Sequence, residues 1–218
     1  MATPKSQRIG IWIIAIVLAI GTIGSFLAMI LGSQNQTIDA ANIKKLQTEY
    51  QAKVDAQSKQ LSDKYYPEFS KYETTPAVFN ADDVKELTKT DLKVGDGLEI
   101  KADTEYSAYY IGWGPDGVVF DQSIKDGALI SPITGGGSTS QMISGWNEGV
   151  IGMKTNGVRE LSIPSAKAYG ETGNGSNIAA NTPIKFIIMI VPTVAAATMP
   201  AELLQYYQSQ QSYQQSTY

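Results

Sequence analysis

The chain has 218 residues, 43% of them apolar, which suffices for one globular domain with additional segments but hardly for two full domains. It contains no histidine and no cysteine, which excludes Ser-His-Asp and Cys-His catalysis, thiol redox chemistry, disulfides and metal sites built on imidazole or thiolate. The formal net charge of −4, without a basic patch, argues against nucleic acid as a partner.

The first organising feature is the segment 9–32, which carries no charge and follows Lys5 and Arg8. A helix of this length rises about 36 Å at ~1.5 Å per residue, enough to cross a hydrocarbon core of ~30 Å. We expect a transmembrane helix, retained as an anchor, because the apolar stretch exceeds the ~7 to 15 residues usual in a cleaved signal peptide, which is the alternative. The basic residues before it predict that residues 1–8 are cytoplasmic and that everything after the span lies outside, at the cell membrane.

Residues 33–75 predict a helical stalk followed by a linker. Between Thr37 and Lys64, side chains at spacings of three and four indicate an amphipathic helix, read as a solvated stalk with a short coiled coil as the alternative. The stripe consists of Ile43, Leu46, Tyr50, Val54, Gln57 and Leu61. Tyr66-Pro67 is expected to end the helix, because the residue before a proline is pushed out of helical geometry, and residues 68–76 are expected to form the linker.

Residues 76–194 show short strand signals separated by turns. Expected strands cover residues 98–101, 104–111, 118–120, 157–163 and 184–191. The last of these is almost wholly apolar, as a central strand would be, and only one short helix is indicated, around residues 146–153. Several antiparallel strands with a single short helix predict an α+β domain.

The remaining segment, residues 195–218, is expected to be a disordered tail. From Gln205 onward it consists only of Gln, Ser, Tyr and one Thr. This composition has too few aliphatic residues to form a core.

Three short motifs lie within the domain in a fixed order. They are Val119-Phe120-Asp121, Gly145-Trp146-Asn147-Glu148-Gly149 and Ala168-Tyr169-Gly170. Their order and spacing resemble the signature of FKBP-type peptidyl-prolyl isomerases, and the resemblance extends from about residue 91 to residue 194. It implies an antiparallel β-sheet half-barrel wrapped around one short α-helix, here preceded by the expected transmembrane helix and stalk.

The residue types suit the chemistry of that family. Rotation about an X-Pro bond crosses a barrier near 20 kcal/mol but breaks no covalent bond, so it needs no nucleophile, metal or cofactor. An apolar cavity that strips water from the planar amide and grips the twisted form lowers the barrier by differential binding. Such a site requires aromatic walls and a few fixed hydrogen-bond donors.

The resemblance assigns roles to individual residues. Trp146 would form the floor beneath the prolyl ring, and the walls would be Tyr110, Phe120, Met142, Ile143 and Phe186, with Ile178 as a further apolar loop contact. Tyr110, Asp121 and Tyr169 would be the catalytic residues: the Tyr169 hydroxyl and the Ile143 amide donate to the substrate carbonyl, and Asp121 orients Tyr110 or faces the twisted amide. Taken alone, Trp146 fits an ordinary core position equally well, and Tyr169 fits a loop-packing role.

Three features depart from the family pattern. Ser131 stands where the family has an aromatic residue at the pocket rim, and Ala179-Ala180 replaces the proline pair that many members carry. The glycine-rich segment 135–140 reads as a flexible insertion. These departures bear on catalytic efficiency.

Two functions remain in competition on this fold. The first is a membrane-anchored bacterial isomerase that assists the folding of exported proteins. Its expected partners are proline-containing unfolded or exported polypeptides, the membrane through the N-terminal helix, and macrolide inhibitors. The alternative is a catalytically weak FKBP-fold chaperone or binding module at the membrane surface, which holds unfolded segments in its apolar cleft.

Overall fold

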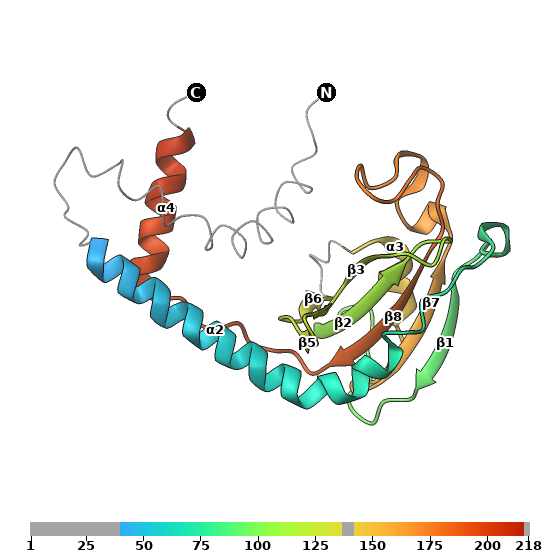
Figure 1. Ribbon diagram of the computed structural model, residues 1–218, viewed down its shortest axis with the longest axis horizontal. Helices are drawn as coiled ribbons and strands as arrows, with labels where there is room; N and C mark the ends of the chain where they lie inside the picture. The colour runs from blue at the N-terminus through green and yellow to red at the C-terminus, as the bar shows by residue number, and fades with distance from the viewer. Residues whose placement is uncertain (1–39, 137–141, 216–218) are drawn as a thin grey trace. The chain divides into compact units, whose positions relative to one another are not determined.

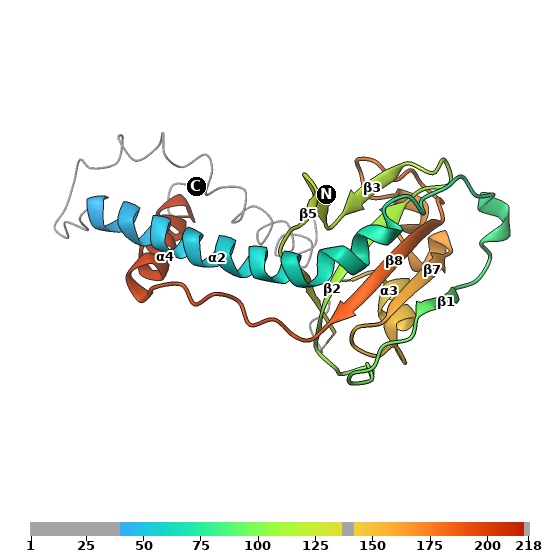
Figure 2. The same cartoon turned by 60° about the horizontal axis from the view of Figure 1, so that its bottom comes forward.

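The computed structural model describes residues 40–136 and 142–215. Within these ranges the chain forms two compact units, one made of residues 40–55 and 197–215 and the other of residues 56–196 (Figures 1 and 2). The transmembrane helix expected at residues 9–32 and most of the insertion expected at residues 135–140 lie outside the described residues. None of the helices inside these ranges is both long and apolar enough to span a bilayer.

The smaller unit combines the first part of helix α2 (Ala40–Phe69) with helix α4 (Ala201–Gln215). Ile43 of α2 and Leu203 of α4 are buried, and Gln47 Nε2 donates to the Tyr207 hydroxyl at 3.2 Å. The prediction of a disordered tail is therefore wrong for residues 201–215. The segment has few aliphatic residues, but glutamine and the leading Ala-Glu-Leu-Leu run favour a helix, which can dock through a few side chains.

Helix α2 fulfils the expected amphipathic pattern but continues past the predicted end. It runs through Pro67 to Phe69, followed by the 3₁₀ turn η2 (Ser70–Tyr72). The prediction that a linker begins at residue 68 is wrong, because residue 69 still belongs to α2 and its side chain is completely buried. Burial of Tyr65 and Phe69 secures the last turn and outweighs the cost of proline two residues before the helix ends.

The larger unit contains one antiparallel six-stranded sheet. Its strands are β1 (Thr88–Lys93), β2 (Tyr106–Trp113), β3 (Val119–Gln122), β6 (Ile133–Gly135), β7 (Val158–Ile163) and β8 (Ile184–Val191). The order is β1-β7-β8-β2-β3, and β6 pairs with the same strand β2 as β3 does. Strand β8 is central, as its apolar sequence predicts.

Two strand predictions differ from the structure. Residues 98–101 form only a single bridge between Glu99 and Lys154. Strand β1 was not predicted, because its sequence Thr-Lys-Thr-Asp-Leu-Lys is polar and entirely exposed, so no alternation marks it as half-buried. It pairs through its backbone with β7 alone, at the edge of the sheet.

Both faces of the sheet are covered. Along β2, Tyr106, Ala108 and Tyr110 belong to a core shared with helix α3 (Ser144–Val150), whereas Tyr109, Ile111 and Trp113 belong to a core shared with α2. This alternation follows from the two-residue period of a strand. The predicted α+β sheet with one short helix is therefore present, and α2 adds a second helix on the opposite face (Figures 1 and 2).

A small hairpin projects between β3 and β6. It consists of β4 (Ile124–Lys125) and β5 (Ala128–Leu129), joined by Asp126 and Gly127, whose φ angles are 52° and 73°. Positive φ at both turn residues is the geometry that Asp-Gly favours in a two-residue hairpin. We call residues 123–132, which carry this hairpin, the flap.

Candidate functional site

The three sequence motifs come together on the α3 face of the sheet. Trp146 and Phe186 lie with ring centroids 5.1 Å apart, Phe120 and Phe186 at 5.6 Å, and Tyr110 and Trp146 at 5.7 Å, all edge to face. Trp146 is only 3% exposed, while Tyr110 and Phe120 are half-buried. The cluster therefore has a buried floor and side walls that solvent reaches.

Local sequence fixes the floor. Gly145 and Gly149 let α3 lie directly against β7, since a Cβ atom at either position would come within 2.3 Å of Ile163 or Leu161. The indole Nε1 of Trp146 donates to the Tyr106 hydroxyl at 2.9 Å. The ring is thus held by packing and by its one polar atom, as a preorganised apolar surface requires.

One wall is organised by a tyrosine and a carboxylate on neighbouring strands. The Tyr110 hydroxyl donates to Asp121 Oδ2 at 2.6 Å. Burial, and then the hydrogen bond to the Asp121 carboxylate, raise the pKa of Tyr110 far above its usual 10.0. The hydroxyl therefore keeps its proton, and the Asp121 side chain is oriented along the edge of the cluster.

Tyr169 approaches the same cluster from the loop after β7. Burial chiefly, and secondarily the charge of Asp121, raise the pKa of its hydroxyl. The hydroxyl makes no hydrogen bond to any residue within the described ranges, although the ring packs against the core. Within the described ranges, the Tyr169 hydroxyl therefore keeps its proton and is not committed to another residue.

The loop that carries Ile178 is fixed to β3. Asn174 Oδ1 accepts from the backbone amides of Ser176, Asn177 and Ile178 at 2.8–3.1 Å. Asn177 Nδ2 then donates to the carbonyl oxygen of Phe120 at 3.1 Å. These bonds place Ile178, which is buried, in the aromatic cluster, while Ala179 and Ala180 are exposed.

The structure thus brings the predicted site residues to one place. The cluster includes Tyr110, Phe120, Met142, Ile143, Trp146, Tyr169, Ile178 and Phe186. Asp121 joins through Tyr110. Nowhere in the described ranges do three His, Cys, Asp or Glu side chains gather in a way that could hold a metal ion.

Three contributors were missed from sequence. Tyr106 anchors the indole, Asn177 ties the loop to β3, and Gly112 makes room for the Phe120–Phe186 pair, because a Cβ atom there would lie 2.4 Å from Phe186. A glycine inside a strand of aromatic and β-branched residues often marks such a close approach. Tyr106 and Asn177 carry no comparable signal.

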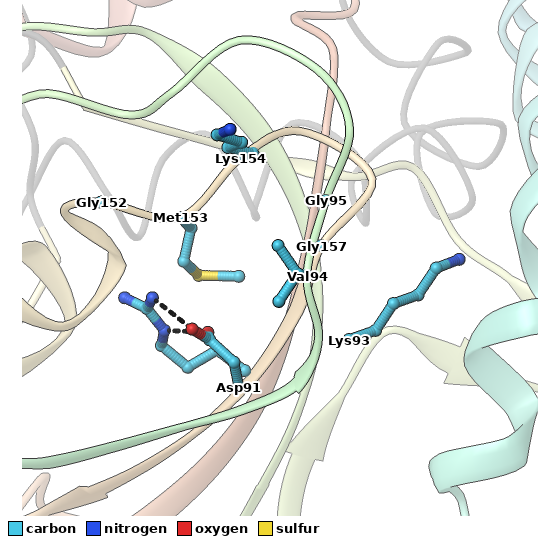
Figure 3. A pocket seen from close by; sticks show the side chains of 9 residues that line it. Asp91, Lys93, Val94, Gly95, Gly152, Met153, Lys154 and Gly157 are labelled. Carbon is cyan, nitrogen blue, oxygen red and sulfur yellow. Dashed lines mark hydrogen bonds and ion pairs between the residues drawn. The ribbon is translucent and has the colours of Figure 1, made fainter.

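A separate small cavity, of about 50 Å³, lies at the far end of α3 (Figure 3). Beside it Arg159 forms a two-bonded ion pair with Asp91, at 2.6 and 3.1 Å, and donates to the carbonyl oxygens of Gly149 and Ile151. The buried guanidinium thereby satisfies carbonyls at the C-terminal end of α3. None of the predicted site residues lines this cavity.

Comparison with known proteins identifies a family to which this chain is similar. Residues 97–191 match the family of FKBP-type peptidyl-prolyl cis-trans isomerases. An FK506-binding protein of Neisseria meningitidis serogroup A is 34% identical over 118 residues, which cover 54% of this chain and 94% of the relative. One from Streptomyces anulatus is 38% identical over 108 residues, covering 49% of this chain and 85% of the relative. A crystal structure of AtFKBP13 is 30% identical, with a TM-score of 0.44, and the match covers 50% of this chain and 93% of that one.

The chain is therefore a peptidyl-prolyl cis-trans isomerase. It belongs to the FKBP-type family, which confirms the resemblance carried by the three motifs. The membrane-anchored type, predicted from residues 1–32, stays a prediction.

Proposed function

We propose that this isomerase acts on proline-containing segments of unfolded, exported polypeptides and thereby assists their folding. The prolyl ring would enter the aromatic cluster, with Trp146 beneath it and Tyr110, Phe120 and Phe186 around it. The observation that carries the proposal is the edge-to-face cluster itself, whose floor is buried and whose walls are partly open.

Catalysis would follow from differential binding. The planar amide is better solvated than the twisted one, so an apolar, water-excluding cluster favours the twisted form. The Tyr169 hydroxyl, protonated and not engaged by the described residues, would donate to the substrate carbonyl together with the Ile143 amide. Asp121, oriented by Tyr110, would face the twisted amide electrostatically, and no proton needs to be transferred.

We also propose where the enzyme works. The uncharged segment 9–32 would hold it in the cell membrane, and Lys5 and Arg8 would keep the N-terminus cytoplasmic. The isomerase domain would then meet polypeptides as they emerge outside the cytoplasm. Because the relatives are named FK506-binding proteins, we propose in addition that FK506 occupies the same cluster.

A peptide assay tests this function. The full chain in detergent should accelerate cis/trans exchange of a tetrapeptide with leucine before proline, without added metal or nucleotide, and FK506 should inhibit it. Phe120→Ala removes a wall and should abolish most of the acceleration. Val118→Ala, two residues earlier at a 61% exposed side chain, is the matched control and should leave it unchanged.

One result would replace this proposal with the binding-module alternative. Exchange at the uncatalysed rate, from a chain that is folded by circular dichroism, would show that the cluster holds apolar segments without accelerating rotation. Binding of unfolded polypeptide without turnover would then be the function.

A further inference from the structure

The flap joins two parts of the aromatic site. It follows Phe120 and Asp121 of β3 and leads into Ile133 of β6, which packs on the cluster. At its base Ser123 exchanges hydrogen bonds with Tyr110: the Ser123 amide donates to the Tyr110 carbonyl at 2.8 Å, and the Tyr110 amide donates to Ser123 Oγ at 3.0 Å. A shift of the flap therefore displaces residues on both sides of the site.

Helix α2 holds the flap from its other side. The Leu129 amide donates to Ser62 Oγ at 2.9 Å, and the hydroxyls of Ser58 and Ser131 share a hydrogen bond of 2.8 Å. Ser58 and Ser62 are four residues apart and so lie on one face of the helix. Figure 2 shows the corresponding part of α2 running beside β5.

Apolar packing supports these two bonds. Ile124 and Leu129 of the flap are buried in the core that also contains Tyr65 of α2, with Leu61 packed against it. Both turns of α2 that face the flap thus contribute a serine and an apolar side chain. At the position where the family resemblance predicts a rim aromatic, the flap carries Ser131, whose hydroxyl is bonded to Ser58 of α2.

Ser62 is the decisive contact. Its side chain is only 7% exposed, and serine is a poor choice inside a helix unless its hydroxyl has a specific partner. Removing the hydroxyl would leave the Leu129 amide without an acceptor inside the protein, and an unpaired buried amide is costly. The structure would respond by moving or loosening the flap.

We propose that Ser62 is a positioning residue for substrate binding, which acts through Leu129 and the flap on the wall of the isomerase site. Helix α2 precedes the residues 97–191 that match the family, yet it belongs to the substrate-binding apparatus of this enzyme. This inference rests on the proposed function, because it assumes that the aromatic cluster binds the X-Pro segment.

Steady-state kinetics of the full chain test the proposal. For Ser62→Ala we expect KM for a cis-enriched tetrapeptide to rise about three- to tenfold, the range for one lost hydrogen bond, with kcat within about twofold of the wild type. Ser62→Thr, which retains a hydroxyl, should restore much of the wild-type KM. Lys59→Ala, on the same helix, is the matched control and should leave KM unchanged, because the Lys59 ammonium bonds to Asp63 and to no other side chain of the described residues.

Amide hydrogen exchange measures directly whether the hydrogen bond from the Leu129 amide to Ser62 Oγ is present. The Leu129 amide should exchange at least about tenfold faster in Ser62→Ala than in Lys59→Ala, while the amides of β8 keep wild-type rates. A purely structural role would instead lower the melting temperature and the active fraction, so that apparent kcat falls with KM unchanged. That outcome, or unchanged exchange at Leu129, overturns the proposal.

The proposed function and this inference fail separately. If the wild-type chain does not accelerate isomerisation, the function fails, and affinity for FK506 takes the place of KM in the comparison of variants. Equal affinities of wild type and Ser62→Ala would then overturn the inference, and a weaker affinity in the variant would support it.

Discussion

At the scale of single residues, the site uses two tyrosines around one carboxylate for different purposes. The Tyr110 hydroxyl is committed to Asp121, whereas the Tyr169 hydroxyl has no hydrogen bond to the described residues. The same chemical group is therefore bonded to a carboxylate at one position, and at the other it is the donor that we propose for the substrate carbonyl. Deleting each hydroxyl should have distinguishable effects.

Tyr169→Phe should lower kcat/KM on the order of tenfold, about 1.4 kcal/mol in the barrier, with the free energy of unfolding nearly unchanged. The reason is that, in the proposed mechanism, the lost hydroxyl donates to the substrate carbonyl, whereas it makes no hydrogen bond within the described part of the fold. Peptide kinetics and thermal denaturation check this, with Tyr66→Phe on the α2 face as control. An unchanged rate with a lower melting temperature would make Tyr169 a loop-packing residue and leave the Ile143 amide as the sole donor.

In a second pair of tyrosines, replacement by phenylalanine should change the free energy of unfolding in opposite directions. The Tyr109 hydroxyl is buried and has no hydrogen-bond partner in the described part of the chain, whereas the Tyr106 hydroxyl accepts from Trp146. Tyr109→Phe should therefore raise the free energy of unfolding by about 1 kcal/mol, and Tyr106→Phe should lower it by ~1 to 3 kcal/mol. Urea denaturation measures both. Equal effects of the two substitutions would contradict this account of the two hydroxyls.

Much of the candidate site could be predicted because three short, ordered motifs carry Phe120, Asp121, Trp146 and Tyr169, and the family resemblance that they support supplied the other residues. The prediction did not reach Tyr106 and Asn177, since their roles depend on contacts between segments far apart in sequence. A tyrosine in a strand and an asparagine in a loop have many uses, and only the folded chain shows which one applies. Gly112 is an intermediate case, because its position inside a strand indicates a close approach but not to which side chains.

At the scale of elements, the main difference between expectation and structure concerns α2. Periodicity predicted the helix and its stripe, but a solvated stalk and a helix docked on a sheet show the same spacing of apolar residues. What decides is the extension beyond Pro67, which places Phe69 in the core of the sheet. Local rules for proline are outweighed there by the burial of an aromatic side chain.

Phe69→Ala should consequently destabilise the isomerase domain by ~3 to 5 kcal/mol, although Phe69 precedes the family match. The cost arises from lost aromatic burial against Tyr109 and from the cavity left behind. Chemical denaturation followed by tryptophan fluorescence measures it, with Val78→Ala, at a side chain 77% exposed, as control. A loss below about 1 kcal/mol would mean that α2 is dispensable for the fold.

At the scale of the whole molecule, buried tyrosines set the response to alkaline pH. Burial raises the pKa of Tyr106, Tyr109, Tyr110 and Tyr169 above the ordinary 10.0. In the unfolded chain these groups lose their protons near pH 10, while in the folded chain they keep them to higher pH. Between the two values the unfolded state binds fewer protons, so stability falls as pH rises.

The tyrosines should therefore leave the free energy of unfolding flat between about pH 6 and 9 and reduce it steeply above about pH 10. Melting temperatures across this range, with absorbance at the tyrosinate band, test the expectation. Tyr109→Phe removes one of the four groups and should flatten the alkaline decline. If the decline in that variant matched the wild type, burial of Tyr109 would not be the cause.

Membrane topology belongs to the same scale. Protease added to intact spheroplasts should digest the isomerase domain, because the proposed topology, based on the positive charges before residue 9, would place everything after residue 32 outside. Protection until lysis would reverse the orientation. Release of a shortened soluble form from untreated cells would instead show that the segment 9–32 is cleaved as a signal.

The order of strands in the sheet also determines when this enzyme can complete its own fold. Strand β8 is the last one synthesised, yet it lies between β2 and β7. Until residue 191 has left the ribosome, β2 can pair only with β3 and β6, and β7 can pair only with the polar edge strand β1. The apolar face of α2 then has no complete sheet to pack against. Such long-range closure delays completion of the sheet until β8 has been synthesised. During its synthesis the isomerase is therefore itself an incompletely folded chain with exposed apolar segments, which is the kind of polypeptide proposed as its substrate.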